Sequence, residues 1–170
     1  MGHMEMFVEQ IVPRRKALKD YAVMGAALFA CTAVLLVSVL VMPYIMPYVI
    51  IVWAVAVFAA YWLMSGRSVE YEYKIVSGDF DVERIIAKRK RKKHISCPIV
   101  SFEHVRRLAE GEVGRMASKG VKVADVSSGG NYREAYCTVA SSDRGKVFLV
   151  FEPNERVLKA LKELLPRKFG

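Results

Sequence analysis

The chain has 170 residues, of which 54% are hydrophobic, and it carries a formal net charge of +9. This length can bury one modest soluble core beside a membrane segment, but not two. Three cysteines without paired spacing argue against a disulfide framework and favour a reducing compartment, and the positive charge favours an anionic partner, either lipid or nucleic acid.

The N-terminal residues precede a long apolar run. Met1-Gly2-His3 is interpreted as a remnant of an expression tag, with the natural start at Met4. A short apolar stripe then ends at Pro13 and is followed by three basic residues. Such a stripe is typical of an interfacial helix that lies flat on a membrane, and a disordered tail is the alternative. We therefore expect an N-terminal interfacial segment over residues 1–19. The stripe consists of Phe7, Val8, Ile11 and Val12.

No charged side chain occurs between Asp20 and Arg67, a run of 46 residues. A helix rises about 1.5 Å per residue and the hydrocarbon core of a bilayer is about 30 Å thick, so this run has roughly twice the length of one crossing. Pro43 and Pro47 lie near its middle. The sequence predicts a hairpin of two transmembrane helices over residues 20–66, whereas a secretory signal needs only one short apolar core.

Lysine and arginine flank the apolar run on both sides, and the predicted turn between the helices carries no charge. Because such residues are retained in the cytoplasm during insertion, we expect a two-span cell-membrane protein with both termini cytoplasmic. No charged residue or histidine lies within either span, which argues against a transporter or pump. The predicted interfacial anchors are Tyr21, Tyr44, Tyr48, Tyr61, Trp62 and Arg67.

Residues 67–170 alternate between apolar and polar side chains and predict one cytoplasmic α+β domain. Residues 69–75 and 80–86 form a predicted β-hairpin around Ser77-Gly78-Asp79. A third strand is expected over residues 94–100, a short helix or strand over 102–108, and a mobile loop with one brief strand over 111–131. Residues 132–140 and 147–151 predict a further β-hairpin, and an amphipathic helix is expected to start near Pro153.

Two short segments carry a resemblance to a known family. The chain resembles bacterial pleckstrin-homology-like (PH-like) membrane proteins, and most closely small membrane proteins of Gram-positive anaerobes, from which no activity carries over. The resemblance implies a strongly bent antiparallel sheet or split barrel capped by a C-terminal helix. It rests on Tyr71-Glu72-Tyr73-Lys74-Ile75-Val76-Ser77-Gly78-Asp79-Phe80-Asp81-Val82 and on Phe151-Glu152-Pro153-Asn154-Glu155-Arg156-Val157-Leu158.

Six consecutive basic residues, which we call the basic run, are the strongest functional candidate: Lys88, Arg89, Lys90, Arg91, Lys92 and Lys93. Six like charges cannot be buried on both faces, so we expect a solvated connector or a projecting strand end. Near an anionic leaflet each lysine or arginine contributes about 1 kcal/mol of binding, which favours contact with lipid headgroups. The alternative is a topology determinant and solvated face. Nucleic acid is disfavoured, because no aromatic residues interleave with the charges.

The preferred function is a membrane-anchored, non-enzymatic binding or scaffold module that contacts anionic headgroups or a protein partner at the inner membrane face. The alternative is a subunit of an oligomeric membrane complex or pore, with intersubunit contacts made by small residues of the helical hairpin.

The sequence predicts no catalytic residue, cofactor or metal site. His94, Cys97 and His104 lack both the spacing and the fourth ligand of a zinc site. Cys137 lies in a predicted strand without a nearby histidine, so it is interpreted as a core residue rather than a nucleophile.

Overall fold

The structure is a computed structural model that describes residues 7–130, 132–143 and 145–169. The interpretation of Met1-Gly2-His3 falls outside these residues. The chain divides into two compact units. One comprises residues 16–69, and the other comprises described residues on both sides of it, 7–15 and 70–169, which we call the head domain.

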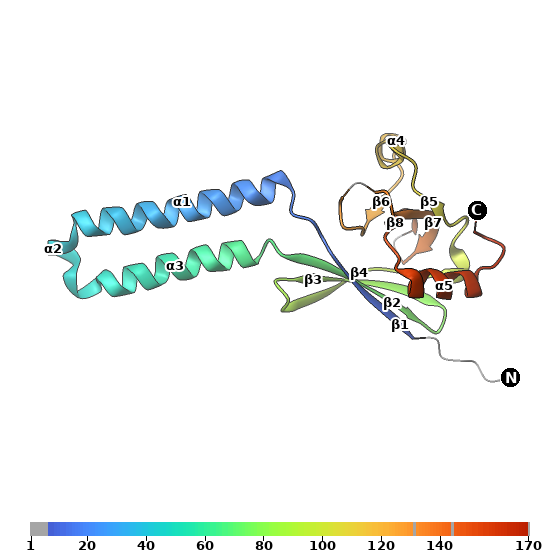
Figure 1. The fold of residues 1–170 in the computed structure, drawn as a ribbon, viewed down its shortest axis with the longest axis horizontal. Coiled ribbons are helices and arrows are strands. Elements are labelled where there is room, and N and C mark those ends of the chain that lie inside the picture. Colours follow the sequence, from blue (N-terminus) through green and yellow to red (C-terminus); the bar gives the residue numbers. More distant parts are fainter. Residues whose placement is uncertain (1–6, 131, 144, 170) are drawn as a thin grey trace. The chain divides into compact units, whose positions relative to one another are not determined.

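The first unit is a helical hairpin (Figure 1). It contains α1 (Leu18–Leu40), α2 (Met42–Ile45), the 3-10 helix η1 (Met46–Tyr48) and α3 (Val49–Ser65). Two helical segments, Leu18–Leu40 and Met46–Ser65, are long and apolar enough to cross a membrane, in agreement with the predicted pair of spans. Proline stands in the first turn of α2, where its missing N–H removes no hydrogen bond of the helix.

One hydrogen bond joins the two long helices of this unit. The indole nitrogen of Trp53 donates to the hydroxyl of Ser38 at 2.7 Å, and Ser38 is buried between the helices at 3% exposure. In hydrocarbon an unpaired polar group is costly, so this contact satisfies two groups at once. It also accounts for the position of a tryptophan inside the apolar helix α3.

The head domain contains a first antiparallel sheet of four strands in the order β1-β2-β3-β4. The strands are β1 (Val8–Pro13), β2 (Val69–Val76), β3 (Asp79–Ile86) and β4 (Lys90–Pro98). Ser77 and Gly78 both have positive φ, as required at the centre of a tight two-residue β-hairpin turn. The predicted first β-hairpin is therefore present, and the third strand starts four residues before the expected position.

The N-terminal stripe forms a strand, so the interfacial helix expected there is wrong. β1 pairs antiparallel with β2 from Val8, opposite Ile75, to Pro13, opposite Glu70. Val12 is buried at 5% exposure, while Ile11 faces solvent. The edge of β2 needs a partner for its backbone groups, and the extended backbone of residues 8–13 supplies one. The helical hairpin is thus inserted between the first two strands of the head domain.

A second sheet has the order β5-β7-β8-β6. Its strands are β5 (Arg106–Arg107), β6 (Val123–Asp125), β7 (Tyr136–Ser142) and β8 (Gly145–Phe151), and a 3-10 helix, η2 (Ile99–Ser101), follows β4. β6 runs parallel to β8, whereas the other pairs are antiparallel. The loop expected over residues 111–131 contains a short helix, α4 (Glu112–Ser118), besides β6.

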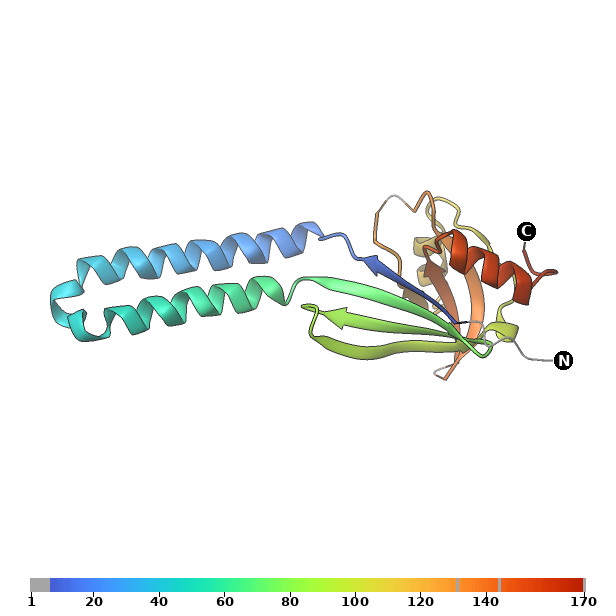
Figure 2. The ribbon, with the colours of Figure 1, turned by 60° about the horizontal axis from the view of Figure 1, so that its bottom comes forward.

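The core lies between the two sheets and is closed by α5 (Glu155–Leu164) (Figure 2). Phe80 is central: its ring centroid lies 5.6 Å from that of Tyr73 and 5.5 Å from that of Phe151. Such tilted aromatic pairs stabilise beyond the area that they bury. The helix buries Val157 and Leu161. This α+β arrangement of antiparallel sheets with a closing C-terminal helix confirms the predicted fold class.

Candidate functional site

The basic run lies partly in a turn and partly in a strand, and all six of its side chains are exposed. Lys88 and Arg89 belong to the turn between β3 and β4, and the other four residues begin β4. The backbone has positive φ at Ala87 and Lys88, which reverses the chain tightly. The exposure agrees with the expectation that six adjacent charges require solvent.

Two of the six charges are compensated by carboxylates of the first sheet. One nitrogen of the Arg91 guanidinium lies 3.1 and 2.9 Å from the two carboxylate oxygens of Glu72, a side chain with 0% exposure. Lys93 lies 3.6 Å from Asp81. The four remaining cations form no ion pair with any carboxylate in the described part of the chain: Lys88, Arg89, Lys90 and Lys92.

Glu72 also receives a second cation. The ammonium of Lys74 lies 3.1 Å from Glu72 and 3.1 Å from Glu83. Burial opposes the charged ammonium, but the hydrogen bonds to Glu83 and Glu72 outweigh it and raise the pKa of Lys74. A buried carboxylate is costly unless charged donors surround it. Arg91 therefore stabilises the sheet as well as adding charge to its surface.

The turn that begins the basic run lies at one definite end of the first sheet. β2 and β3 have eight residues each and are joined by a two-residue turn, so Ile86 returns to the level of Val69. Ile86 pairs with Lys90, and Pro13 pairs with Glu70. The basic turn is therefore at the same end of the sheet as the two points where the chain leaves for the helical hairpin (Figure 2).

The aromatic residues predicted as interfacial anchors lie near the ends of the two apolar helices and are exposed. Tyr21 is in the first turns of α1, and Tyr61 and Trp62 are in the last turns of α3. Tyr44 and Tyr48 lie in the connection, within α2 and η1. Arg67 follows α3 in an exposed turn. Contact of these residues with headgroups stays a prediction.

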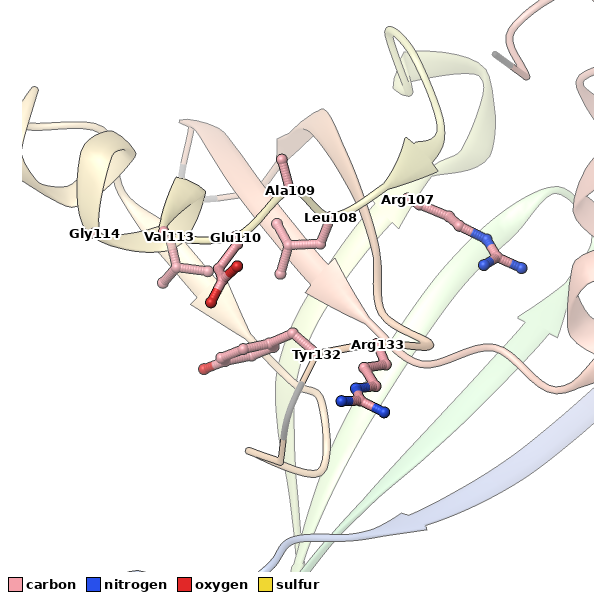
Figure 3. A pocket seen from close by; sticks show the side chains of 9 residues that line it. Arg107, Leu108, Ala109, Glu110, Val113, Gly114, Tyr132 and Arg133 are labelled. Carbon is pink, nitrogen blue, oxygen red and sulfur yellow. The ribbon is translucent and has the colours of Figure 1, made fainter.

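A second candidate site is an open cavity of about 670 Å³ on the head domain. Its walls come from β5, from the segment leading into α4, and from residues 132–133 (Figure 3). Leu108, Val113 and Tyr132 supply apolar surface, while Arg107, Glu110 and Arg133 supply charge. Sequence reasoning missed this cavity, because its walls are about 20 residues apart and only the sheet brings them together.

Tyr132 is fixed in the cavity wall by its hydroxyl. The phenol donates to a carboxylate oxygen of Asp125 at 2.9 Å. Burial and this hydrogen bond raise the pKa of Tyr132 to about 12, so the ring stays neutral at physiological pH. The other oxygen of Asp125 accepts from the hydroxyl of Ser127 at 2.6 Å, which holds the carboxylate in place.

Arg106 is adjacent to the cavity residue Arg107 but is committed to an ion pair. Its guanidinium contacts both carboxylate oxygens of Glu112, whose side chain is 6% exposed. The hydrogen bond from Arg106 lowers the pKa of Glu112 and raises that of Arg106 itself. Arg106 therefore does not add a free charge to the basic run or to the cavity.

Of the residues considered as metal ligands, His94 and Cys97 lie in β4 and His104 precedes β5, whereas Cys137, considered as a nucleophile, lies in β7. Cys97 and Cys137 are buried at 0% and 1% exposure, and burial raises the pKa of each thiol to about 11. Among residues 7–130, 132–143 and 145–169, no group of three or more His, Cys, Asp or Glu side chains is placed to hold a metal ion. The two thiols are core groups rather than poised nucleophiles.

Two facing, mainly antiparallel sheets are closed by a C-terminal helix, and two apolar helices are inserted between the first two strands. This arrangement defines a PH-like domain with a helical insertion. The family model described as bacterial PH-like domain (DUF6106) matches residues 4–170. The chain belongs to this family. Comparisons with curated proteins and with solved structures gave no significant match. PH-like domains generally act as binding or scaffold modules rather than enzymes.

Proposed function

We propose that the protein is a non-enzymatic membrane-anchored module whose basic run contacts anionic lipid headgroups at the inner face of the cell membrane, with both termini cytoplasmic. The helical hairpin provides the anchor and the head domain provides the contact. The observation that carries this proposal is the position of the basic turn, at the sheet end from which the chain leaves for the helical hairpin.

Covalent connectivity supports the proposal. Residues 14–17 join β1 to α1, and residues 66–68 join α3 to β2. Links of three or four residues span at most about 10–14 Å when extended. The opposite end of the sheet, at Ser77, is about 23 Å farther along the strands, whereas electrostatic attraction to a membrane decays over about 8 Å at physiological salt. Only the end with the basic turn is held within reach of headgroups by such short links.

The charge count supports the same proposal. Four cations of the basic run have no carboxylate partner among the described residues. At about 1 kcal/mol each near an anionic surface, they contribute about 4 kcal/mol of docking free energy. That is sufficient to hold the head domain against the leaflet for most of the time, because each 1.4 kcal/mol is about tenfold in population.

The test uses the full chain in nanodiscs. A fluorophore is attached to Arg89→Cys in a Cys31→Ser background, and its quenching by acrylamide is compared between phosphatidylcholine discs and discs that also contain phosphatidylglycerol. We expect the anionic discs to reduce quenching at position 89. The same label on Ser77→Cys, at the far end of the sheet, is the matched control and should be insensitive to lipid charge.

A variant that lacks three of the six charges completes the experiment. Replacing Lys88, Lys90 and Lys92 with glutamine should abolish the dependence on anionic lipid at position 89 and leave the fold intact, because none of the three is ion-paired to a described carboxylate. Equal quenching of the original basic run in neutral and anionic discs contradicts the proposal.

A further inference from the structure

Two guanidinium groups and one carboxylate line the cavity on the head domain. Arg107 and Arg133 are exposed, and neither forms an ion pair with a carboxylate among the described residues. In Figure 3 both side chains lie on one side of the cavity, whereas the carboxylate of Glu110 and the ring of Tyr132 lie on the other. The cavity thus has a cationic side and a largely apolar side that also carries the carboxylate of Glu110.

The apolar side is held rigidly. Leu108, Val113 and Tyr132 pack against a buried cluster that includes Cys137 and Phe148. Tyr132 also has a positive φ of 54°, a conformation that costs a non-glycine residue about 1 kcal/mol or more and persists only where its surroundings determine it. The hydrogen bond of its phenol to Asp125 is one such determinant. The cavity wall is therefore formed before any ligand arrives.

The loop that forms one wall is tied to the segment leading into the helical hairpin. The carbonyl of Ser128 accepts from the backbone N–H of Arg15 at 2.7 Å. A Cβ atom placed on Gly130 would lie 3.2 Å from the guanidinium carbon of Arg15, so the two residues are in close contact. Arg133 is three residues after Gly130, and α1 starts three residues after Arg15. The segment that follows β1 thus holds the loop that precedes Tyr132 in place.

We propose that this cavity binds a phosphate group attached to a short apolar body, through Arg107 and Arg133 on the phosphate and Leu108, Val113 and Tyr132 on the apolar part. Guanidinium groups match the oxygens of a phosphate with paired donors, and two of them can share its charge. A phospholipid headgroup and a soluble phosphoester both offer this chemistry. In the first case the cavity adds a specific site to the surface docking proposed above and rests on that function, whereas in the second it is independent of it.

The experiment is calorimetric titration of the full chain in an uncharged detergent. The probes are dihexanoyl phosphatidate, glycerol 3-phosphate, inorganic phosphate and hexanoate. We expect dihexanoyl phosphatidate to bind, and the pair of substitutions Arg107→Gln and Arg133→Gln to weaken it about 100-fold, since hydrogen bonds to charged groups are strong and two are lost. The matched control is Lys90→Gln with Lys92→Gln, which removes the same charge from the basic run and should leave the affinity unchanged.

The probes separate the two sources of phosphate. Dihexanoyl phosphatidate binding more tightly than glycerol 3-phosphate identifies a lipid headgroup, and equal binding of both, still dependent on the two arginines, identifies a soluble phosphoester. Tighter binding of hexanoate overturns the assignment to phosphate. The site itself is overturned if the control pair weakens binding equally, or if the substitutions of Arg107 and Arg133 leave the affinity unchanged.

The two proposals also fail separately. The control pair should reduce the lipid-dependent protection of the head domain in nanodiscs without changing the calorimetric affinity of the cavity. The pair Arg107→Gln and Arg133→Gln should weaken the calorimetric affinity of the cavity without changing the lipid-dependent protection of the head domain. A melting temperature measured for each variant shows that the head domain is folded, so loss of binding reports on the site.

Discussion

The basic run contains two kinds of charge, and Arg91→Gln separates them. Arg91 is the closest cation to the fully buried carboxylate of Glu72, with distances of 3.1 and 2.9 Å to its two oxygens. Removing one partner of a buried ion pair costs about 3–5 kcal/mol. Because the Arg91 side chain is 58% exposed and Lys74 still contacts the carboxylate, solvent screening reduces this to about 2 kcal/mol.

The same substitution at Lys92 should behave differently. Lys92 is exposed and has no ion pair with a carboxylate in the described ranges, so Lys92→Gln should change the free energy of unfolding by less than about 0.5 kcal/mol. For a head domain of about this size, 2 kcal/mol corresponds to roughly 10 °C in melting temperature. Arg91→Gln should therefore melt roughly 10 °C lower than Lys92→Gln, although the two variants have equal net charge.

The fold offers a direct assay for this difference. Cys97 and Cys137 are buried, so a thiol-reactive dye reports unfolding of the head domain in detergent once Cys31 has been replaced by serine. Adding Glu72→Gln to Arg91→Gln should recover part of the lost stability, because the buried charge is then removed as well. Equal melting temperatures for the two single variants refute the reasoning that Arg91 is structural.

Three further predictions concern the rest of the fold. A fragment of residues 68–170 lacks β1, so its thermal transition by circular dichroism should be broader and lower in temperature than that of the full chain. Because the ends of β1 and β2 are paired, joining β1 to the fragment through a two-residue turn should restore the transition. Trp53→Phe removes the hydrogen bond to Ser38 and should weaken the association of the two helices by about 0.6 kcal/mol in a denaturing-detergent titration. An unchanged midpoint of that titration would show that the hydrogen bond does not stabilise the helix pair. Glu112→Gln should destabilise the head domain at neutral pH by about 2 kcal/mol, because the partly exposed Arg106 loses its counter-ion. The pKa of Glu112 is lowered in the folded state from 4.5, so its contribution is complete above that value and is lost as pH falls through the lowered folded pKa. The stability gap to the glutamine variant should therefore close in acid, and a gap independent of pH argues against the ion pair.

Much of the fold was predictable because its signals are local. The two apolar spans follow from a run without charge, and the turn at Ser77 and Gly78 follows from residues that tolerate positive φ. The closing helix begins at Asn154, whose side chain accepts from the N–H of Val157 at 2.9 Å, a standard helix start. Each of these features depends on neighbours within a few residues.

β1 was not predictable in this way, because its partner lies beyond the whole helical hairpin. The apolar positions from Phe7 to Val12 satisfy helical spacing, and β-branched residues at three of them are too weak a signal to decide for a strand. Pairing with β2 selects the strand conformation. Gln10 contributes as well, because its side chain donates to the carbonyl of Glu152 and accepts from the N–H of Asn154, each at 2.8 Å. Contacts across more than 140 residues leave no local trace in the sequence.

The candidate site likewise combines features that local sequence predicts with features that depend on tertiary contacts. Exposure of the basic run was predictable, since six adjacent charges cannot be buried together. The pairing of Arg91 with Glu72 was not, because it depends on strand order and on a register shift between Val82 and Glu83. The cavity needs the tertiary approach of residues 107–114 to residues 132–133, for which no motif exists.

The proposed function requires that the end of the head domain carrying the basic turn faces the headgroups. The most direct measurement is paramagnetic relaxation from a spin-labelled lipid headgroup in anionic nanodiscs, recorded on the full chain at backbone amides of both ends of β3. We predict strong relaxation at Arg89 and weak relaxation at Ser77, about 23 Å away along the strands. Equal relaxation at both ends, or stronger relaxation at Ser77, contradicts it.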